Sequence, residues 1–239
     1  TVSGAWPLRG SAAASTLGAP LPGSGIVYCL TVADHIIVPR DISVPYPYTI
    51  DGKYPGAGYH FETLTTMSFL AGATKRIRFA TSVMIAPYRN PILTAKMLSS
   101  LDVLSNGRVI VGLGVGWMKE EFDNLQAPPF KDRGKVTDEY IKAFRELWTS
   151  DNPSFDGKYC NFSNVVFLPK PVQKPTIPIW IGGHSKQALR RAGVQAWFDR
   201  EAPGDLVARA SGAGKTILFA CSSASTNQAS GAIRFAGRA

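Results

Sequence analysis

Cysteine is scarce in this sequence, and long apolar runs are missing. The 239 residues include three cysteines, Cys29, Cys160 and Cys221, which are too few and too scattered for a disulfide framework or a zinc site. No apolar run approaches the roughly 20 residues that a membrane-spanning helix requires, and the first residues lack the basic and then apolar pattern of a secretion signal. We therefore expect a cytoplasmic protein that binds no metal and no membrane.

Acidic residues are in the minority, with 17 Asp and Glu against 26 Lys and Arg, which gives a net charge of +9. Much of this excess lies from residue 186 onward, where eight basic residues stand against three acidic ones (8 − 3 = +5). Aromatic residues do not interleave these charges in the way that a base-stacking surface requires. We interpret the excess as a solvated basic tail and expect no nucleic-acid partner, so nucleic-acid binding is the weakest functional hypothesis.

Periodic patterns are missing from both ends of the chain. Residues 1–27 are rich in Ala, Gly, Ser and Pro, which predicts an irregular, low-complexity segment. Residues 193–239 form an atypical basic tail that is again rich in Ala, Gly and Ser. The predicted domain therefore covers residues 28–192.

The most informative stretch is LDVLSNGRVIVGLGVGW at residues 101–117. Apolar residues recur at helical spacing from Leu93, after a cap and first-turn proline at Asn90-Pro91, and this predicted helix ends at residues 105–107, SNG. Residues 109–111 form a continuous apolar run that is typical of a parallel strand covered on both faces. Glycines at positions 112, 114 and 116 would let a flat ligand or a phosphate approach the backbone. The pattern predicts a loop at the carboxyl end of a parallel strand, where α/β proteins place their chemistry.

The rest of the predicted domain alternates between strands and helices. Further buried strands are predicted at residues 25–37, 76–85 and 179–181, and further helices at 61–73, 138–148 and 182–192. Predicted loops lie between them at 38–60, 118–134 and 151–178. This alternation favours an α/β fold with a parallel sheet and right-handed crossovers.

Five segments together resemble the luciferase-like monooxygenase family, whose members are (β/α)8-barrel enzymes that use flavins or deazaflavins. The segments are ADHI at 33–36, ATSVMIAPYRNP at 80–91, LDVLSNGR at 101–108 with GLGVGW at 112–117, RGKVTDEY at 133–140 and PIWIGGHS at 178–185. The resemblance covers about residues 32–192 and is strongest to the branch that uses coenzyme F420, a deazaflavin that carries hydride. It implies a TIM-barrel type of fold, here incomplete, with about four recognisable βα units.

Both ends depart from the family pattern. The family opens with a strand and a helix, and after position 192 it continues with a glycine-aspartate-glycine-aromatic segment that supplies phosphate contacts. Residues 1–27 and 193–239 show neither feature. We expect that these ends are not family sequence, and a shift of the reading frame is one explanation for them.

The resemblance implies a cofactor ring at the carboxyl ends of the strands, close to Asp34 and His35. His35, beside Asp34, is expected to hold or shuttle a proton there, whereas the residues alone favour a histidine that only caps the end of a strand. Ser82 and Val83 match the place where the family often has a bulge or a non-proline cis peptide that supports the ring from behind. Without the resemblance, these two residues would be ordinary strand residues.

Small residues are expected to hold the rest of the cofactor. Gly114 and Gly116 would let its tail pass, although they could also be packing glycines. Gly182, Gly183 and Ser185 lie at the N-terminus of a predicted helix, so they offer backbone N–H groups and a hydroxyl to a phosphate. For these three residues, phosphate binding and a purely structural role are equally open.

Aromatic residues are predicted to line the substrate pocket. Tyr46 and Tyr48 lie in the predicted loop at 38–60, and Trp117 follows the glycines. They indicate a small apolar or aromatic organic substrate. Trp117 stands where the sugar-phosphate dehydrogenases of the family carry an acidic residue, so a sugar phosphate is not expected.

Two functional hypotheses from different classes follow. The first is an oxidoreductase of the monooxygenase class that acts on a small organic substrate with reduced coenzyme F420, or with FMN as the alternative cofactor. The second is a non-catalytic binding or scaffold protein that retains part of the barrel. Exposed edges of an incomplete parallel sheet favour self-association, so a homodimer is among the expected assemblies.

Overall fold

The fold was analysed in a computed structural model, which describes residues 29–47, 49–54, 56, 60–183 and 185–198. Predictions for residues 1–28 and 199–239 lie outside the described residues. Within the described part of the chain, no helix combines the length and apolar character that crossing a membrane would take.

A parallel sheet forms the centre of the described structure, and β4 (Val109–Gly114) is its central strand. On one side β4 pairs with β2 (Arg78–Thr81) and β3 (Met84–Ile85), and β2 pairs in turn with β1 (Cys29–Val32). On its other side β4 pairs with β7 (Ile179–Ile181). Every pairing in this sheet is parallel, which confirms the predicted α/β architecture.

Two of the predicted strands differ from the observed ones. The strand predicted at 76–85 is divided into β2 and β3, because Ser82 and Val83 leave the ladder between them. The strand predicted at 25–37 is described only as β1 and ends at Val32, because Asp34 turns into the interior to bind other residues.

The helices lie between the strands, as their bounds show. They are α1 (Thr63–Ala73), α2 (Pro91–Ser105), α3 (Lys119–Asn124), α4 (Arg133–Thr149) and α5 (Lys186–Phe198), with short 3-10 helices η1 (Ala86–Tyr88) and η2 (Phe130–Asp132). The loop predicted at 118–134 is therefore wrong, since it contains α3 and η2. The connector predicted at 151–178 likewise contains an antiparallel pair, β5 (Phe155–Asp156) and β6 (Asn161–Phe162). Helix α5 continues past residue 192, where the sequence pattern ends.

Local signals fix the ends of α2 as predicted. The Asn90 side chain accepts hydrogen bonds from the backbone N–H groups of Ile92 and Leu93, and Pro91 takes the first helical position. Asn106 closes the helix in the left-handed conformation, with φ of 56°. The strong cap at each end sets the point at which the chain enters β4.

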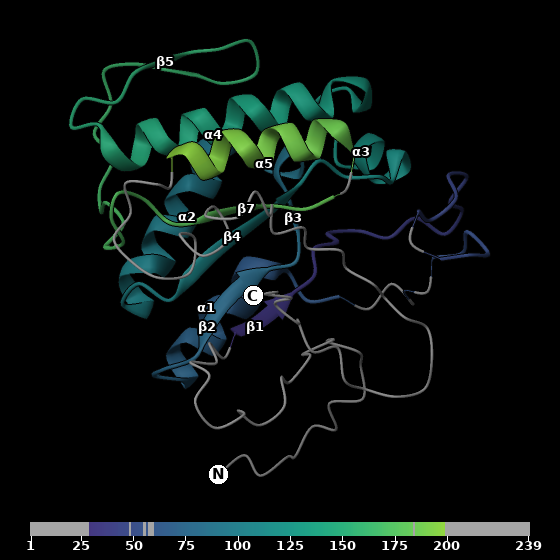
Figure 1. The fold of residues 1–239 in the computed structure, drawn as a ribbon, viewed down its shortest axis with the longest axis horizontal. Helices are drawn as coiled ribbons and strands as arrows, with labels where there is room; N and C mark the ends of the chain where they lie inside the picture. The colour runs from purple at the N-terminus through teal and green to yellow at the C-terminus, as the bar shows by residue number, and fades with distance from the viewer. Residues whose placement is uncertain (1–28, 48, 55, 57–59, 184, 199–239) are drawn as a thin grey trace, which may run out of the picture.

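The core lies between the sheet and the helices α1, α2 and α4. Phe144 and Trp148 of α4 stack with ring centroids 5.5 Å apart, and the Trp148 indole N–H donates to the Ala95 carbonyl at 3.1 Å. In Figure 1, α4 and α5 cover the upper side of the sheet, while the segment that follows β1 extends to the right, on the same side as α3. The segments that follow β1 and β4 therefore lie at the same end of the sheet.

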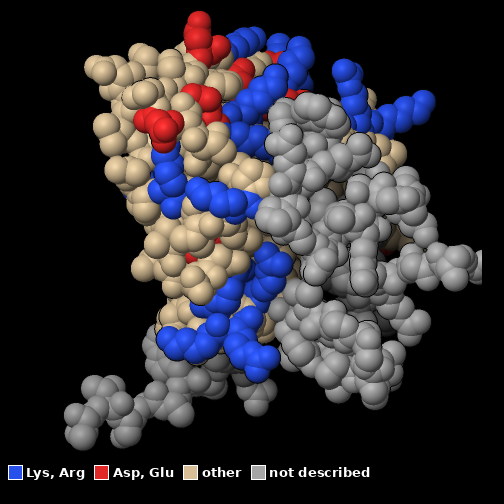
Figure 2. Space-filling view, turned by 60° about the vertical axis from the view of Figure 1, so that its left-hand side comes forward, with Lys and Arg blue, Asp and Glu red and all other residues tan. Residues whose placement is uncertain are grey.

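Charged side chains are spread over the surface. On the face shown in Figure 2, Lys and Arg side chains form several groups separated by uncharged residues, and Asp and Glu lie among the upper groups. The described part of this face therefore carries interrupted basic groups, and nucleic-acid binding gains no support from it.

Candidate active site

Asp34 follows β1 and is buried, with 4% of its surface exposed. Its carboxylate accepts two hydrogen bonds from Arg89, at 2.8 and 2.6 Å, one from the Ile85 N–H at 2.8 Å and one from the Thr63 hydroxyl at 3.0 Å. The same guanidinium also donates to Glu62 at 2.8 Å. Because both oxygens of Asp34 are occupied by protein donors, this geometry favours a positioning role for Asp34 over direct contact with a substrate.

His35 faces a carboxylate that the sequence analysis did not identify. Its Nδ1 lies 2.8 Å from Oε2 of Glu121, whose side chain is completely buried. Oε1 of Glu121 accepts from the backbone N–H groups of Ile36 and Ile37, at 2.8 and 3.3 Å, and Oε2 also accepts from the Tyr88 hydroxyl at 3.0 Å. Glu121 thus binds the chain just after β1 and orients the predicted catalytic histidine.

Glu120, the neighbour of Glu121 in the first turn of α3, binds the same loop further along. It accepts hydrogen bonds from both the hydroxyl and the backbone N–H of Ser43, the latter at 2.8 Å. These hydrogen bonds hold the pKa of the Glu120 carboxyl below its usual value. Two consecutive glutamates therefore fasten the loop after β1 to a helix that follows β4.

An aromatic cluster surrounds His35. Its ring centroid lies 5.1 Å from that of Tyr54 and 5.2 Å from that of His60, and the Tyr54 hydroxyl lies 3.2 Å from Nε2 of His60. Tyr46 and Trp117 complete the cluster, with centroids 5.0 Å apart and each within 5.6 Å of Tyr54. The structure thus connects two of the three predicted pocket residues, Tyr46 and Trp117, to His35 through Tyr54, while Tyr48 lies outside the described residues.

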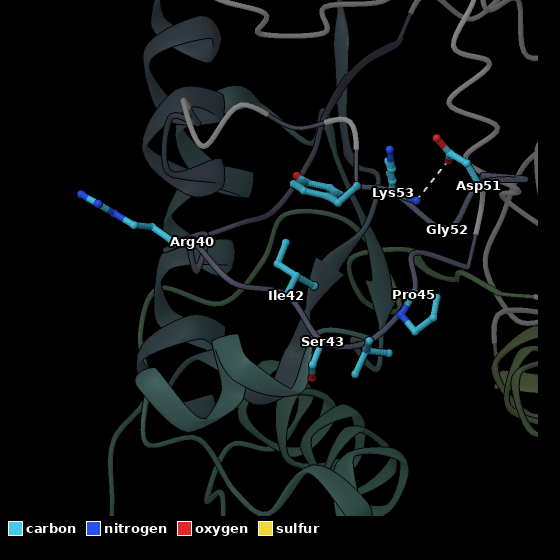
Figure 3. Close-up of a pocket in the computed structure, with 9 residues that line it drawn as sticks. Arg40, Ile42, Ser43, Pro45, Asp51, Gly52 and Lys53 are labelled. Carbon is cyan, nitrogen blue, oxygen red and sulfur yellow. Dashed lines mark hydrogen bonds between the residues drawn. The ribbon is translucent and has the colours of Figure 1, made fainter.

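Next to the cluster, the loop after β1 lines an open pocket of about 480 Å³. Figure 3 shows Ser43 and Pro45 on one side of it and Asp51 and Lys53 on the other, where the Lys53 N–H donates to Asp51 at 3.1 Å. Tyr54 lines this pocket as well as contacting His35. A small molecule in the pocket would therefore be separated from His35 by one aromatic ring.

Val83 lies where the ends of three strands converge. The peptide bond between Ser82 and Val83 is cis, in agreement with the resemblance. A methyl group on Gly114 would lie 2.6 Å from the Val83 side chain, and one on Gly182 would lie 2.7 Å from it. These two glycines therefore make room for Val83, so the packing interpretation accounts for them, and any part in cofactor binding stays a prediction.

The remaining predicted glycines lie beside α3 and α5. A methyl group on Gly116 would lie 2.6 Å from the Phe122 ring, so this glycine also makes room for a protein side chain. Gly183 has a φ of 110°, a conformation that favours glycine, and Ser185 caps α5 by accepting a hydrogen bond from the Ala188 N–H at 3.1 Å. The predicted phosphate site therefore coincides with the beginning of a 13-residue helix.

The environment of His60 makes the stability of this region depend on pH. Burial, followed by the nearby His35, lowers the pKa of His60 from its usual 6.5, and this outweighs the opposite effect of Glu121 and Asp34. Below about pH 6.5 the unfolded chain binds a proton at His60 that the folded chain does not, so the contribution of His60 is complete above that pH and is lost as the pH falls. We expect the melting temperature to fall more between about pH 7.5 and about pH 5.5 in the unmodified chain than in a His60→Asn variant. Equal falls would contradict this prediction.

Together, these features define an α/β protein of the TIM-barrel type, with a polar and aromatic site at the carboxyl ends of its parallel strands. Comparison with known proteins identifies the family. The profile of the luciferase-like monooxygenase family matches residues 35–197, which is more than half of the chain. The chain belongs to the luciferase-like monooxygenase family, as the resemblance implied.

Known relatives are longer than this chain. An uncharacterised protein of Mycobacterium tuberculosis is 37% identical over 165 residues, which are 68% of this chain and 56% of that protein. The FMNH2-dependent dimethylsulfone monooxygenase of Pseudomonas putida is 33% identical over 146 residues, 60% of this chain and 40% of the enzyme. A solved F420-dependent secondary alcohol dehydrogenase, in complex with an F420-acetone adduct, is 25% identical with a TM-score of 0.56, over 71% of this chain and 47% of its own. The chain thus spans about half the length of these proteins, which agrees with the incomplete barrel.

Proposed function

We propose that this chain provides the cofactor and proton-handling part of a luciferase-like oxidoreductase that acts on a small apolar or aromatic molecule. The observation that carries the proposal is His35, which a buried carboxylate holds just after a strand and whose ring lies against those of Tyr54 and His60. An imidazole in such a place can accept or release a proton while the rings exclude water. Membership of the family supports the same chemistry.

The residues present fit a flat ring with an anionic tail. Val83 offers an apolar surface between strand ends, and the beginning of α5, next to Gly183, offers the backbone N–H groups and positive end of a helix. The Ser185 oxygen accepts from Ala188, which leaves its O–H to donate to a phosphate. When bound, the reduced cofactor would supply the reducing equivalents, and the protein would orient it and exclude water. We favour coenzyme F420 over FMN, since the sequence segments most resemble the F420 branch.

Equilibrium titration of the purified chain with coenzyme F420 and with FMN, followed by fluorescence, tests this proposal. We expect saturable binding of at least one of them, and tighter binding of F420. Riboflavin, which lacks the phosphate of FMN, is the matched control ligand, and we expect it to bind about tenfold more weakly than FMN, because a single charge-assisted contact contributes about 1.5 kcal/mol. A folded chain that binds neither cofactor would contradict the proposal and favour the scaffold hypothesis.

A further inference from the structure

We propose that Glu121 is a positioning residue that fixes the proton of neutral His35 on Nδ1, so that Nε2 is the nitrogen that exchanges a proton with the substrate. This inference rests on the proposed function of His35 and adds the group that sets its tautomer. Glu121 is fully buried, and the His35 side chain is 12% exposed, so the pair lies at the boundary between the core and the site.

The chemistry of each partner of Glu121 decides which group donates and which accepts the hydrogen bond. The N–H groups of Ile36 and Ile37 have no lone pair to offer, so they must donate to Oε1. Burial, with the charge of Glu121 as the next cause, raises the pKa of Tyr88 far above its usual value, so its hydroxyl keeps its proton and donates to Oε2. A carboxylate that receives these donors presents only acceptor lone pairs, so Nδ1 of His35 must donate as well.

The opposite ring nitrogen is then the reactive one. In a neutral imidazole one nitrogen donates and the other accepts, so a proton on Nδ1 leaves the lone pair on Nε2. Nε2 lies on the opposite edge of the ring from Glu121. A proton taken from a substrate hydroxyl would form the N–H bond at Nε2 as the O–H bond breaks, and the positive imidazolium would be paired with Glu121. The reverse transfer would return the proton.

A simpler explanation is that Glu121 only fastens residues 36 and 37 to α3, and that the contact with His35 is incidental. The substitution Glu121→Gln separates the two explanations, because an amide has one accepting and one donating end. The backbone N–H groups need the carbonyl end of the amide, so its NH2 group must turn toward Nδ1 of His35. Nδ1 would then have to accept, and the proton of His35 would move to Nε2.

The test is the ring nitrogen spectrum of the full chain labelled with 15N-histidine, recorded at alkaline pH, where an ordinary imidazole is neutral. The chain has three histidines, so a His35→Gln variant assigns the signals. We expect the unmodified chain to carry the proton on Nδ1, and Glu121→Gln to carry it on Nε2. Glu120→Gln is the matched control: it places the same change one residue away, on the carboxylate that binds Ser43, and should leave the tautomer on Nδ1.

The outcomes are decisive even if a variant fails to fold. A proton on Nε2 in the unmodified chain would overturn the inference, and so would a folded Glu121→Gln variant whose proton stays on Nδ1. Where cofactor-dependent turnover is measured, we expect Glu121→Gln to reduce it by about 10² to 10⁴-fold, the range of acid–base catalysis. The expected tautomers without cofactor binding would instead count against the proposed function alone.

Discussion

Replacing Asp34 by Ala is expected to lower the free energy of unfolding by about 3 to 5 kcal/mol, because it leaves the buried guanidinium of Arg89 without its main partner. The Asp34 side chain is fully buried and that of Arg89 is 11% exposed, so water cannot replace the lost carboxylate. The Ile85 N–H loses this acceptor as well. Denaturant unfolding followed by circular dichroism measures the change.

A surface ion pair provides the control. Lys119 and Asp123 are paired four residues apart in α3, and their side chains are 55% and 58% exposed. We therefore expect Asp123→Ala to cost less than about 1 kcal/mol, as for most pairs at a surface. Similar losses in the two variants would show that burial does not govern the contribution of Asp34.

Replacing Gly112 by Ala is expected to have an effect of similar size, about 3 kcal/mol, at the upper end of the cost of overpacking. The added methyl group would lie 2.1 Å from the backbone carbonyl oxygen of Thr81. This carbonyl belongs to β2, the neighbour of β4, so it cannot move away as a flexible side chain could. The two strands would have to separate, and the hydrogen bond from the Thr81 hydroxyl to the Gly112 carbonyl, now 2.6 Å, would lengthen.

Gly72 is the matched control for Gly112. It lies exposed within α1, and a methyl group there would meet no other atom within 4 Å. Alanine is the better helix former, so Gly72→Ala should raise the free energy of unfolding by roughly 0.5 to 1 kcal/mol. We therefore expect the free energy of unfolding to rise in Gly72→Ala and to fall in Gly112→Ala. A fall in both variants would contradict this prediction.

Much of the fold was predictable because its signals are local. The cap at Asn90 and the SNG turn fix α2 from neighbouring residues alone, and the apolar run after the turn marks the central strand. By contrast, the sequence pattern did not reveal α3, because its six residues, KEEFDN, are too few for a helical period to emerge. Their two glutamates at the start of a helix were the available signal, since acidic residues favour that position.

The site was less predictable, because its partners are distant in the sequence. His35 and Asp34 were proposed from the resemblance, but nothing near them in the chain points to Glu121 or Arg89, which lie 86 and 55 residues away. His60 was recognised as part of a loop, and its proximity to His35 became visible only in the folded chain. The glycines were over-interpreted from the sequence. They were expected to leave space for a ligand, but Val83 fills the space beside Gly114 and Gly182.

The bonds from Glu120 and Glu121 also set the order in which this region can form during synthesis. Ser43 and His35 leave the ribosome 77 and 86 residues before the carboxylates that bind them. At about 5 to 20 residues per second, that interval lasts roughly 4 to 17 s. For that time the backbone N–H groups of Ile36 and Ile37 have no carboxylate of α3 to bind. The loop after β1 therefore stays unfastened until α3 has been made, and Tyr54 likewise has to wait for Trp117, whose ring it contacts in the folded chain.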